Sequence, residues 1–304
     1  MALTSVVLAA ALLTTAAVGS ATPSGLVDAP VAPTQLIAAA KKQDANLPVF
    51  GANDWTCKPS AAHPHPVVLV HGTFAPPAAV FADLAPLLKL DGYCLFALHY
   101  GLAPILGEVL PGVQKIDQVA EELSTYVDGV LAATGAKQVD IVGHSLGGMM
   151  PRQYLRFNGG AAKVRTLVGI SPTNYGTELF GINRLAQLLS PVRDGVTALC
   201  PACTDQLDTS EFIEHLNAGG DTEPGVAYTV IASLLDQVAQ PAVKSSFLRD
   251  ANPKVDNILL QDVCPIAIDM HQTTSLNPLV IRLVRNALDP DHATGVDCTN
   301  LINP

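Results

Sequence analysis

Short apolar runs alternate along the chain with segments whose apolar residues recur at helical spacing. Pro66–His71 is a continuous apolar run, typical of a strand buried on both faces, and Ala78–Leu90 then carries Phe81, Leu84 and Leu88 at helical spacing. Further strands are expected at Tyr93–Tyr100, Val139–Val142, Val164–Ile170, Val226–Ala232 and Asn257–Val263, and further helices at Val113–Ala133, Ser145–Phe157 and Leu276–Leu288. This alternation predicts an α/β fold with a mostly parallel central sheet and helices on both faces.

The segment Val113–Ala133 shows the clearest helical period. Its apolar residues form one stripe, made of Ile116, Val119, Leu123, Val127 and Val130. We expect this stripe to pack in the core and not to bind a ligand. Between Pro172 and Gly225 the periodicity is irregular, which predicts an insertion above the sheet.

Composition favours a single globular domain, which we place at residues 47–304. The chain has 304 residues, 49% of them hydrophobic, and a mean hydropathy of +0.32, so it can bury a sizeable core without a metal or a partner. Its net charge of -10 and the absence of a basic cluster argue against nucleic acid as a partner. Charged residues make up only 14%, which fits either contact with apolar material or a large buried core.

The N-terminus resembles an export signal. An apolar run from Val6 to Val18 precedes the small residues 19–21, as signal peptidase cleavage sites require. The run is shorter than the about 20 apolar residues of a membrane span. We therefore predict a signal peptide over residues 1–21, a secreted protein, and a loosely ordered, Ala- and Pro-rich segment over residues 22–46.

The chain has six cysteines, an even number that suits disulfide formation after export. Of the possible pairings we favour Cys57 with Cys94, Cys200 with Cys203, and Cys264 with Cys298. Residues 200–203 also form a CxxC motif, which elsewhere indicates a redox dithiol or half a zinc site. Because the chain has no second CxxC, and this one does not open a helix directly after a strand, we favour structural bridges.

The strongest chemical signal is Gly143-His144-Ser145-Leu146-Gly147, which matches the G-x-S-x-G nucleophile elbow. It follows a predicted buried strand and opens a predicted helix. A serine on such a tight turn stands exposed above the sheet, and small residues two positions away let strand and helix approach closely. Ser145 is the predicted nucleophile, and the backbone N–H of Leu146 is the predicted first donor of an oxyanion hole.

A second oxyanion donor is expected on the loop after the first strand, at residues 71–74. We assign the N–H of Thr73, with Phe74 as a neighbouring alternative. His71 has two interpretations: it orders this loop, or it acts as a base. We favour the first, because the triad order of this fold places the histidine after the serine.

Three histidines after Ser145 are candidate bases: His215, His271 and His292. His271 lies shortly after the last predicted strand, where the fold presents its base. His215 falls within the irregular insertion, and His292 lies in a polar tail. We therefore predict His271 as the general base.

The acid of the triad is expected after the strand Val226–Ala232. Asp236 lies directly behind that strand, and its role would be to hold the imidazole tautomer and stabilise the imidazolium. Asp262 and Asp269 remain competitors because both are close to His271 in sequence.

The chain resembles the secreted class 2 lipases of bacteria, a branch of the α/β-hydrolase superfamily. The resemblance extends from about Trp55 to Pro290 and rests on four motifs, at residues 70–74, 143–152, 172–177 and 261–265. It implies a Ser-Asp-His triad at Ser145, Asp236 and His271. It also implies that the insertion at residues 172–225 is a lid or part of an acyl-binding wall. Leu179, Phe180 and Ile182 would then bind substrate with Phe74, although core packing explains the first three equally well.

These residues together predict a secreted lipase or carboxylesterase that hydrolyses lipid esters through an acyl-enzyme intermediate. We expect no metal and no organic cofactor, a monomer, and transient contact with a lipid interface. Two alternatives stay open. One is an acyltransferase or thioesterase on the same triad, and the other is a binding protein that kept the fold without catalysis.

Overall fold

The chain divides into two compact units, and all the residues that the structure describes belong to the second unit. The units are residues 1–31 and Ala32–Pro304. The computed structural model describes residues 32, 34–36, 38, 48–105, 108–178, 190–250, 252, 254–296 and 298. The expected signal peptide and most of the segment over residues 22–46 lie outside the described residues.

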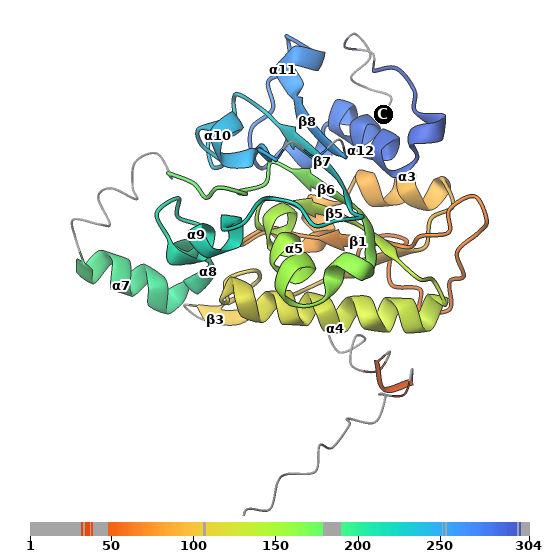
Figure 1. Cartoon of the computed structure of the whole chain (residues 1–304), viewed down its shortest axis with the longest axis horizontal. Coiled ribbons are helices and arrows are strands. Elements are labelled where there is room, and N and C mark those ends of the chain that lie inside the picture. Colours follow the sequence, from red (N-terminus) through yellow and green to blue (C-terminus); the bar gives the residue numbers. More distant parts are fainter. Residues whose placement is uncertain are drawn as a thin grey trace, which may run out of the picture. The chain divides into compact units, whose positions relative to one another are not determined.

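A six-stranded parallel sheet runs through the second unit, in the order β2-β1-β5-β6-β7-β8 (Figure 1). Its strands are β1 (Val67–Val70), β2 (Leu95–Leu98), β5 (Val139–His144), β6 (Val164–Ile170), β7 (Ala227–Ala232) and β8 (Val255–Leu259). Every residue of β1, β2 and β5 is buried, as expected for strands covered on both faces.

Helices cover both faces of this sheet. The α-helices of the described residues are α2 (Pro77–Val80), α3 (Leu84–Leu90), α4 (Ile116–Thr134), α5 (Leu146–Phe157), α7 (Ser190–Leu199), α8 (Pro201–Asp205), α9 (Glu211–Asn217), α10 (Ala242–Ser246), α11 (Leu260–Val263) and α12 (Pro278–Leu288). In β1, Val68 and Val70 pack with α4 and α5, whereas Val67 and Leu69 pack with α3 and α12. The whole predicted stripe of α4 is buried in the first of these two clusters, which confirms its role in the core.

The structure contradicts the prediction of one helix over Ala78–Leu90. Helix α2 ends at Val80 and α3 begins at Leu84, with a turn between them. Pro86 explains the break, because it has no backbone N–H and its ring would clash with a preceding helical turn. Pro86 is tolerated as the third residue of α3, because the N–H groups in the first turn of a helix have no partner within the helix.

The last predicted strand, Asn257–Val263, is also wrong in its second half. Strand β8 ends at Leu259, and α11 follows at once. Leu259 pairs with Ala232, the final residue of β7, so the neighbouring strand offers no further partner. The sequence pattern also missed the hairpin of β3 (Ala103–Ile105) and β4 (Glu108–Leu110), whose strands are too short for a clear period.

Two of the three predicted disulfides are present. Cys57 is bonded to Cys94, and Cys200 to Cys203. The prediction for Cys264 and Cys298 is wrong: no bond joins them, and the Cys298 thiol donates to the carbonyl oxygen of Val263 at 3.2 Å. Cys298 is thus hydrogen-bonded to the residue that precedes Cys264 and not to Cys264 itself.

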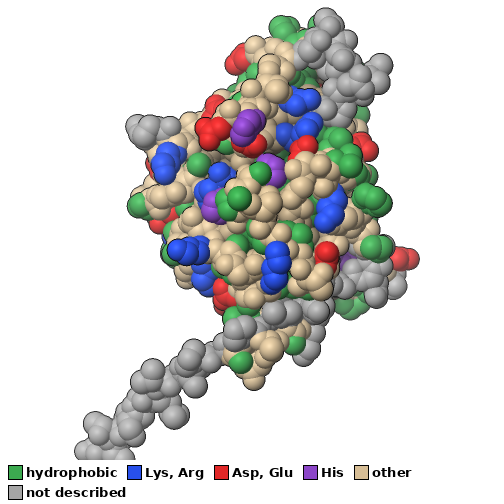
Figure 2. Space-filling view, turned by 90° about the vertical axis from the view of Figure 1, so that its right-hand side faces the viewer, with side chains coloured by type: hydrophobic (Ala, Val, Ile, Leu, Met, Phe, Trp, Pro, Cys, Tyr) green, Lys and Arg blue, Asp and Glu red, His purple; other side chains and the backbone are tan. Residues whose placement is uncertain are grey.

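Positive and negative side chains are interspersed on the face of the molecule in Figure 2. Ion pairs join Arg285 with Asp91 and Lys163 with Asp128. Within the described ranges, no helix combines the length and hydrophobicity that a bilayer span requires.

Candidate active site

Ser145 lies on a sharp turn between β5 and α5. Its backbone has φ 57° and ψ −123°, a region that non-glycine residues rarely adopt and that stores strain at functional sites. The two motif glycines explain how the turn fits. A Cβ on Gly143 would lie 1.8 Å from the Gly147 carbonyl oxygen, and one on Gly147 would lie 2.1 Å from that of Val70. Both positions therefore require glycine.

The structure brings Ser145, His271 and Asp236 together at the carboxyl edge of the sheet. Ser145 Oγ lies 2.9 Å from His271 Nε2, and His271 Nδ1 lies 2.8 Å from Asp236 Oδ2. All three are buried, with 1–6% of each residue exposed. Three segments more than thirty residues apart in the chain thus form one hydrogen-bonded series.

Asp236 is held as a carboxylate. Burial by itself would raise the pKa of Asp236, but hydrogen bonds from His271 and from the N–H groups of Val238 and Ala239 bring it below its usual value. A carboxylate only accepts, so His271 must carry its hydrogen on Nδ1. Its Nε2 is then left to accept the hydroxyl hydrogen of Ser145.

The competing candidates contact other groups. The Asp269 carboxylate accepts a hydrogen bond from Asn277, and Asp262 lies on α11. His215 stacks on Phe157 with ring centres 4.7 Å apart, and the exposed His292 binds Asp289.

The loop after β1 lies against Ser145. A Cβ on Gly72 would come within 2.9 Å of Ser145 Cβ. The Phe74 N–H donates to the Pro111 carbonyl at 2.9 Å, so it is not available to a substrate. In the part of the chain that the structure describes, the N–H groups of Thr73 and Leu146 donate to no protein acceptor. Of the two predicted alternatives for the second donor, the geometry therefore favours Thr73.

His71 holds this loop in place. Its Nδ1–H donates to the Gly72 carbonyl at 2.8 Å, and its Nε2 accepts from the Tyr100 N–H at 3.3 Å. The Tyr100 hydroxyl donates to the His71 carbonyl at 2.6 Å. Burial lowers the pKa of His71 to about 3, so the ring is neutral. These contacts support the interpretation that His71 orders the loop.

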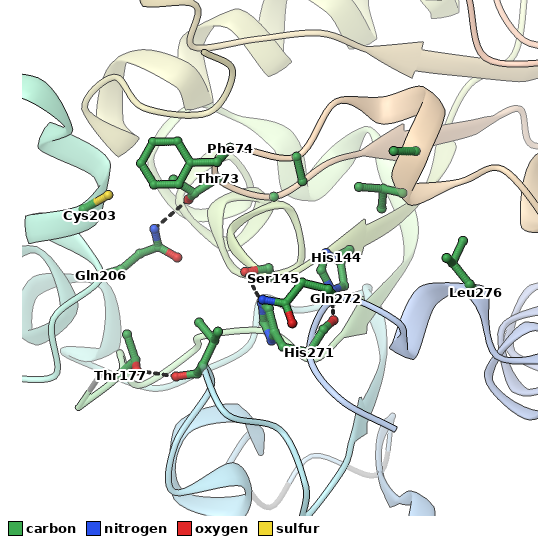
Figure 3. Close-up of a pocket in the computed structure, with 15 residues that line it drawn as sticks. Thr73, Phe74, His144, Ser145, Thr177, Cys203, Gln206, His271, Gln272 and Leu276 are labelled. Carbon is green, nitrogen blue, oxygen red and sulfur yellow. Dashed lines mark hydrogen bonds between the residues drawn. The ribbon is translucent and has the colours of Figure 1, made fainter. Parts of the chain in front are cut away.

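A cavity of about 500 Å³ opens beside Ser145 and His271 (Figure 3). Its wall is mostly apolar and consists of residues 72–75, Ala79, Val80, His144, Thr177, Cys203, Gln206, Val238, Gln272 and Leu276. Phe74, a predicted substrate-binding residue, is among the residues that line it. Leu179, Phe180 and Ile182 lie outside the described residues.

Several residues of the site had no signal in the sequence. Gln206 follows α8 in the irregular insertion, and its Nε2 donates to Thr73 Oγ1 at 2.9 Å. Figure 3 shows its side chain directed toward Thr73. Gln237 and His144 also contact the site, and each is the chain neighbour of a predicted triad residue. Across the described ranges, no three His, Cys, Asp or Glu side chains gather as metal ligands would.

Solved structures with a similar fold include lipases. Lipase B of Aspergillus fumigatus has a TM-score of 0.62 and 21% identity, over 90% of this chain and 60% of that one. The chain thus spans less than two thirds of the length of that lipase. The mature lipase BlEst2 of Bacillus licheniformis has a TM-score of 0.45 and 19% identity, over 61% of this chain and 69% of that one. The first of these likenesses, with the parallel sheet, shows the α/β-hydrolase fold.

The family model described as lipase (class 2) matches residues 64–246. This range includes Ser145 and Asp236, whereas His271 lies beyond it. Since the match covers more than half of the 304 residues, the chain belongs to the class 2 lipase family.

Proposed function

We propose that this protein hydrolyses carboxylic esters of lipids, with Ser145 as nucleophile, His271 as general base and Asp236 as the acid that orients the base. The single observation that carries the proposal is the hydrogen-bonded series from Ser145 through His271 to Asp236, placed at the end of an apolar cavity. Family membership supports an ester hydrolase, and the apolar wall supports an acyl chain as the group that is bound.

In the first step, Ser145 Oγ attacks the ester carbonyl carbon while His271 Nε2 takes the hydroxyl proton. The carbonyl oxygen becomes an oxyanion, for which the N–H groups of Thr73 and Leu146 are the proposed donors. His271 then gives its proton to the alkoxide that leaves. Asp236 stabilises the imidazolium without becoming protonated, which fits its lowered pKa.

In the second step, water attacks the acyl-enzyme. His271 takes a proton from the water as the second tetrahedral intermediate forms. The Ser145 oxygen leaves and recovers a proton from His271, and the carboxylic acid is released. The geometry needs no group beyond these residues and water to balance the protons.

The proposal includes export of the protein. The two disulfides are compatible with an oxidising compartment, and the apolar run at residues 6–18 has the length of a signal peptide core. The lipid substrate would then be met outside the cell.

Replacement of the nucleophile tests the proposal. In Ser145→Ala, hydrolysis of p-nitrophenyl esters should fall by a factor on the order of 10⁴ or more, with folding unchanged by circular dichroism. A fluorophosphonate should label the wild type at Ser145 and leave the variant unlabelled. Retention of activity within about tenfold of the wild type would refute the assignment.

A further inference from the structure

The main chain of His271 is held by side chains. His271 lies between α11 and the 3-10 turn at residues 274–276, and within the described ranges its backbone groups make no hydrogen bond to another backbone group. Its N–H donates to Gln237 Oε1 at 2.9 Å. Its carbonyl oxygen accepts from His144 Nε2 at 2.8 Å. Because His271 is 5% exposed, these two bonds also satisfy backbone groups that would be costly to bury alone.

The two residues that make these bonds are chain neighbours of the other two members of the series. His144 precedes Ser145, and Gln237 follows Asp236. The end of β5 and the turn after it therefore contact His271 twice, through His144, the last residue of the strand, at the carbonyl and through Ser145 at the ring. The β7 loop does the same through Asp236 at the ring and Gln237 at the N–H. Figure 3 shows His144 beside His271, with its bond to the His271 main chain.

We propose that His144 and Gln237 form a clamp that positions His271, in which His144 is a positioning residue for the proton transfer between Ser145 and His271. This proposal rests on the proposed function, because it takes His271 to be the base. The clamp fixes the main chain from two sides, so the ring can keep both of its hydrogen bonds while the proton moves. A base that shifts by about 1 Å loses on the order of 10²-fold in rate.

The chemistry of His144 suits this role. A carbonyl only accepts, so His144 carries its hydrogen on Nε2, and its Nδ1 is a buried atom without a partner in the described part of the chain. Burial lowers the pKa of His144 to about 3, so the ring is neutral in the pH range where esterases work. Its ring centre is 4.9 Å from that of His271. A neutral donor therefore orients the base without opposing the positive charge that forms on it.

His144 is also enclosed on its far side. A Cβ on Gly72 would come within 3.4 Å of Nδ1, so the imidazole packs between the loop after β1 and the loop that carries His271. The ring has little room to turn, which keeps Nε2 directed at the His271 carbonyl. Because the ring is closely packed, a substitution at His144 changes both the hydrogen bond to His271 and the packed volume. Two variants are therefore needed to separate these effects.

The test compares His144→Leu, which removes the donor, with His144→Gln, which keeps an amide N–H on a side chain of similar length. We expect His144→Leu to lower kcat for a p-nitrophenyl ester by about 10- to 100-fold, with KM within about twofold of the wild type. His144→Gln should recover most of the lost kcat. Gln237→Leu removes the acceptor on the other side and should lower kcat in the same way.

Thr134→Val is the matched control for a buried residue that loses its side-chain hydrogen bonds, because Thr134 Oγ1 also accepts from the Ala136 N–H at 3.3 Å. Thr134 is 6% exposed and donates to the Val130 carbonyl at the end of α4, ahead of the N-terminal edge of β5. Its kcat should equal that of the wild type, although its melting temperature falls. Ser145→Ala in the same assay separates the two proposals: activity retained there refutes the proposed function itself.

Three results would overturn the clamp while Ser145→Ala is inactive. The first is a kcat for His144→Leu within about twofold of the wild type. The second is an equal loss in His144→Leu and His144→Gln, which would point to packing alone. The third applies if His144→Leu does not fold, in which case a normal kcat in Gln237→Leu decides against the clamp. A reduced kcat in Gln237→Leu together with a normal kcat in His144→Gln would instead support the clamp.

Discussion

Two buried histidines near Ser145, His71 and His144, predict a loss of stability in mild acid. Burial lowers the pKa of His71 and of His144 from 6.5 to about 3. Between these values the unfolded chain binds a proton at each site and the folded protein does not. Stability therefore decreases as the pH falls from about 6.5 toward 3, and it is fully present above 6.5.

The size of the effect follows from proton linkage. With an unfolded pKa of 6.5 and a folded pKa of about 3, moving from pH 7 to pH 5 costs about 2 kcal/mol of unfolding free energy per histidine. The two sites together cost about 4 kcal/mol, which is a large share of a typical net stability of about 5–15 kcal/mol. Buried carboxyls such as Asp140, whose pKa is raised by burial, act in the opposite direction.

The variant His144→Gln isolates one of these contributions, because an amide does not titrate. Urea unfolding of the wild type and the variant at pH 7 and pH 5 gives the loss for each protein, and contributions from the other groups cancel in the difference. The variant should lose about 2 kcal/mol less than the wild type over this interval. His292→Gln is the control of opposite sign, because Asp289 raises the pKa of this exposed histidine. Removing His292 should not reduce the loss of unfolding free energy between pH 7 and pH 5. An equal loss in His144→Gln and the wild type would show that His144 is not held neutral by burial.

Two further predictions concern the elbow and the acid. Gly147→Ala should unfold the protein or lower its unfolding free energy by an amount on the order of 3–5 kcal/mol, because the new Cβ would lie 2.1 Å from the Val70 carbonyl oxygen. In the control Gly195→Ala, on α7, the new Cβ meets no atom within 4 Å. This control should be neutral or stabilising in a thermal melt. Asp236→Asn should lower kcat by a factor on the order of 10³–10⁴ with little change in stability, because the amide no longer favours the hydrogen on His271 Nδ1. Asp262→Asn should leave kcat near the wild-type value, and a larger loss in this variant than in Asp236→Asn would reassign the acid.

The positions of Ser145, Asp236 and His271 relative to the predicted strands made it possible to predict from the sequence that they lie together. A parallel sheet delivers the carboxyl ends of its strands to one edge, so residues on the segments that connect β5, β7 and β8 to the next elements of the chain meet there. Ser145, Asp236 and His271 all occupy such positions. For the same reason the loop after β1 could be assigned next to the serine before any contact was known.

Contacts that depend on side-chain direction could not be predicted in this way. Gln206 reaches Thr73 from an insertion with no regular period, and the pattern of apolar residues carries no information about where its amide points. The choice between Thr73 and Phe74 as donor depends on the Pro111 carbonyl, which approaches from a different loop. The pairing of Cys264 with Cys298 failed because an even number of cysteines does not determine distance.

The sequence by itself determined the alternation of strands and helices, the stripe of α4 that packs in the core, and the elbow at Ser145. These features are local, since they depend on residues a few positions apart and on the backbone freedom of glycine. Only the tertiary structure decided what surrounds His271. Its N–H, its carbonyl and both ring nitrogens bond to residues at least 34 positions away in the chain, at Gln237, His144, Asp236 and Ser145. Hydrogen bonds of about 3 Å require the packed geometry of three loops at once, and no linear pattern specifies that geometry.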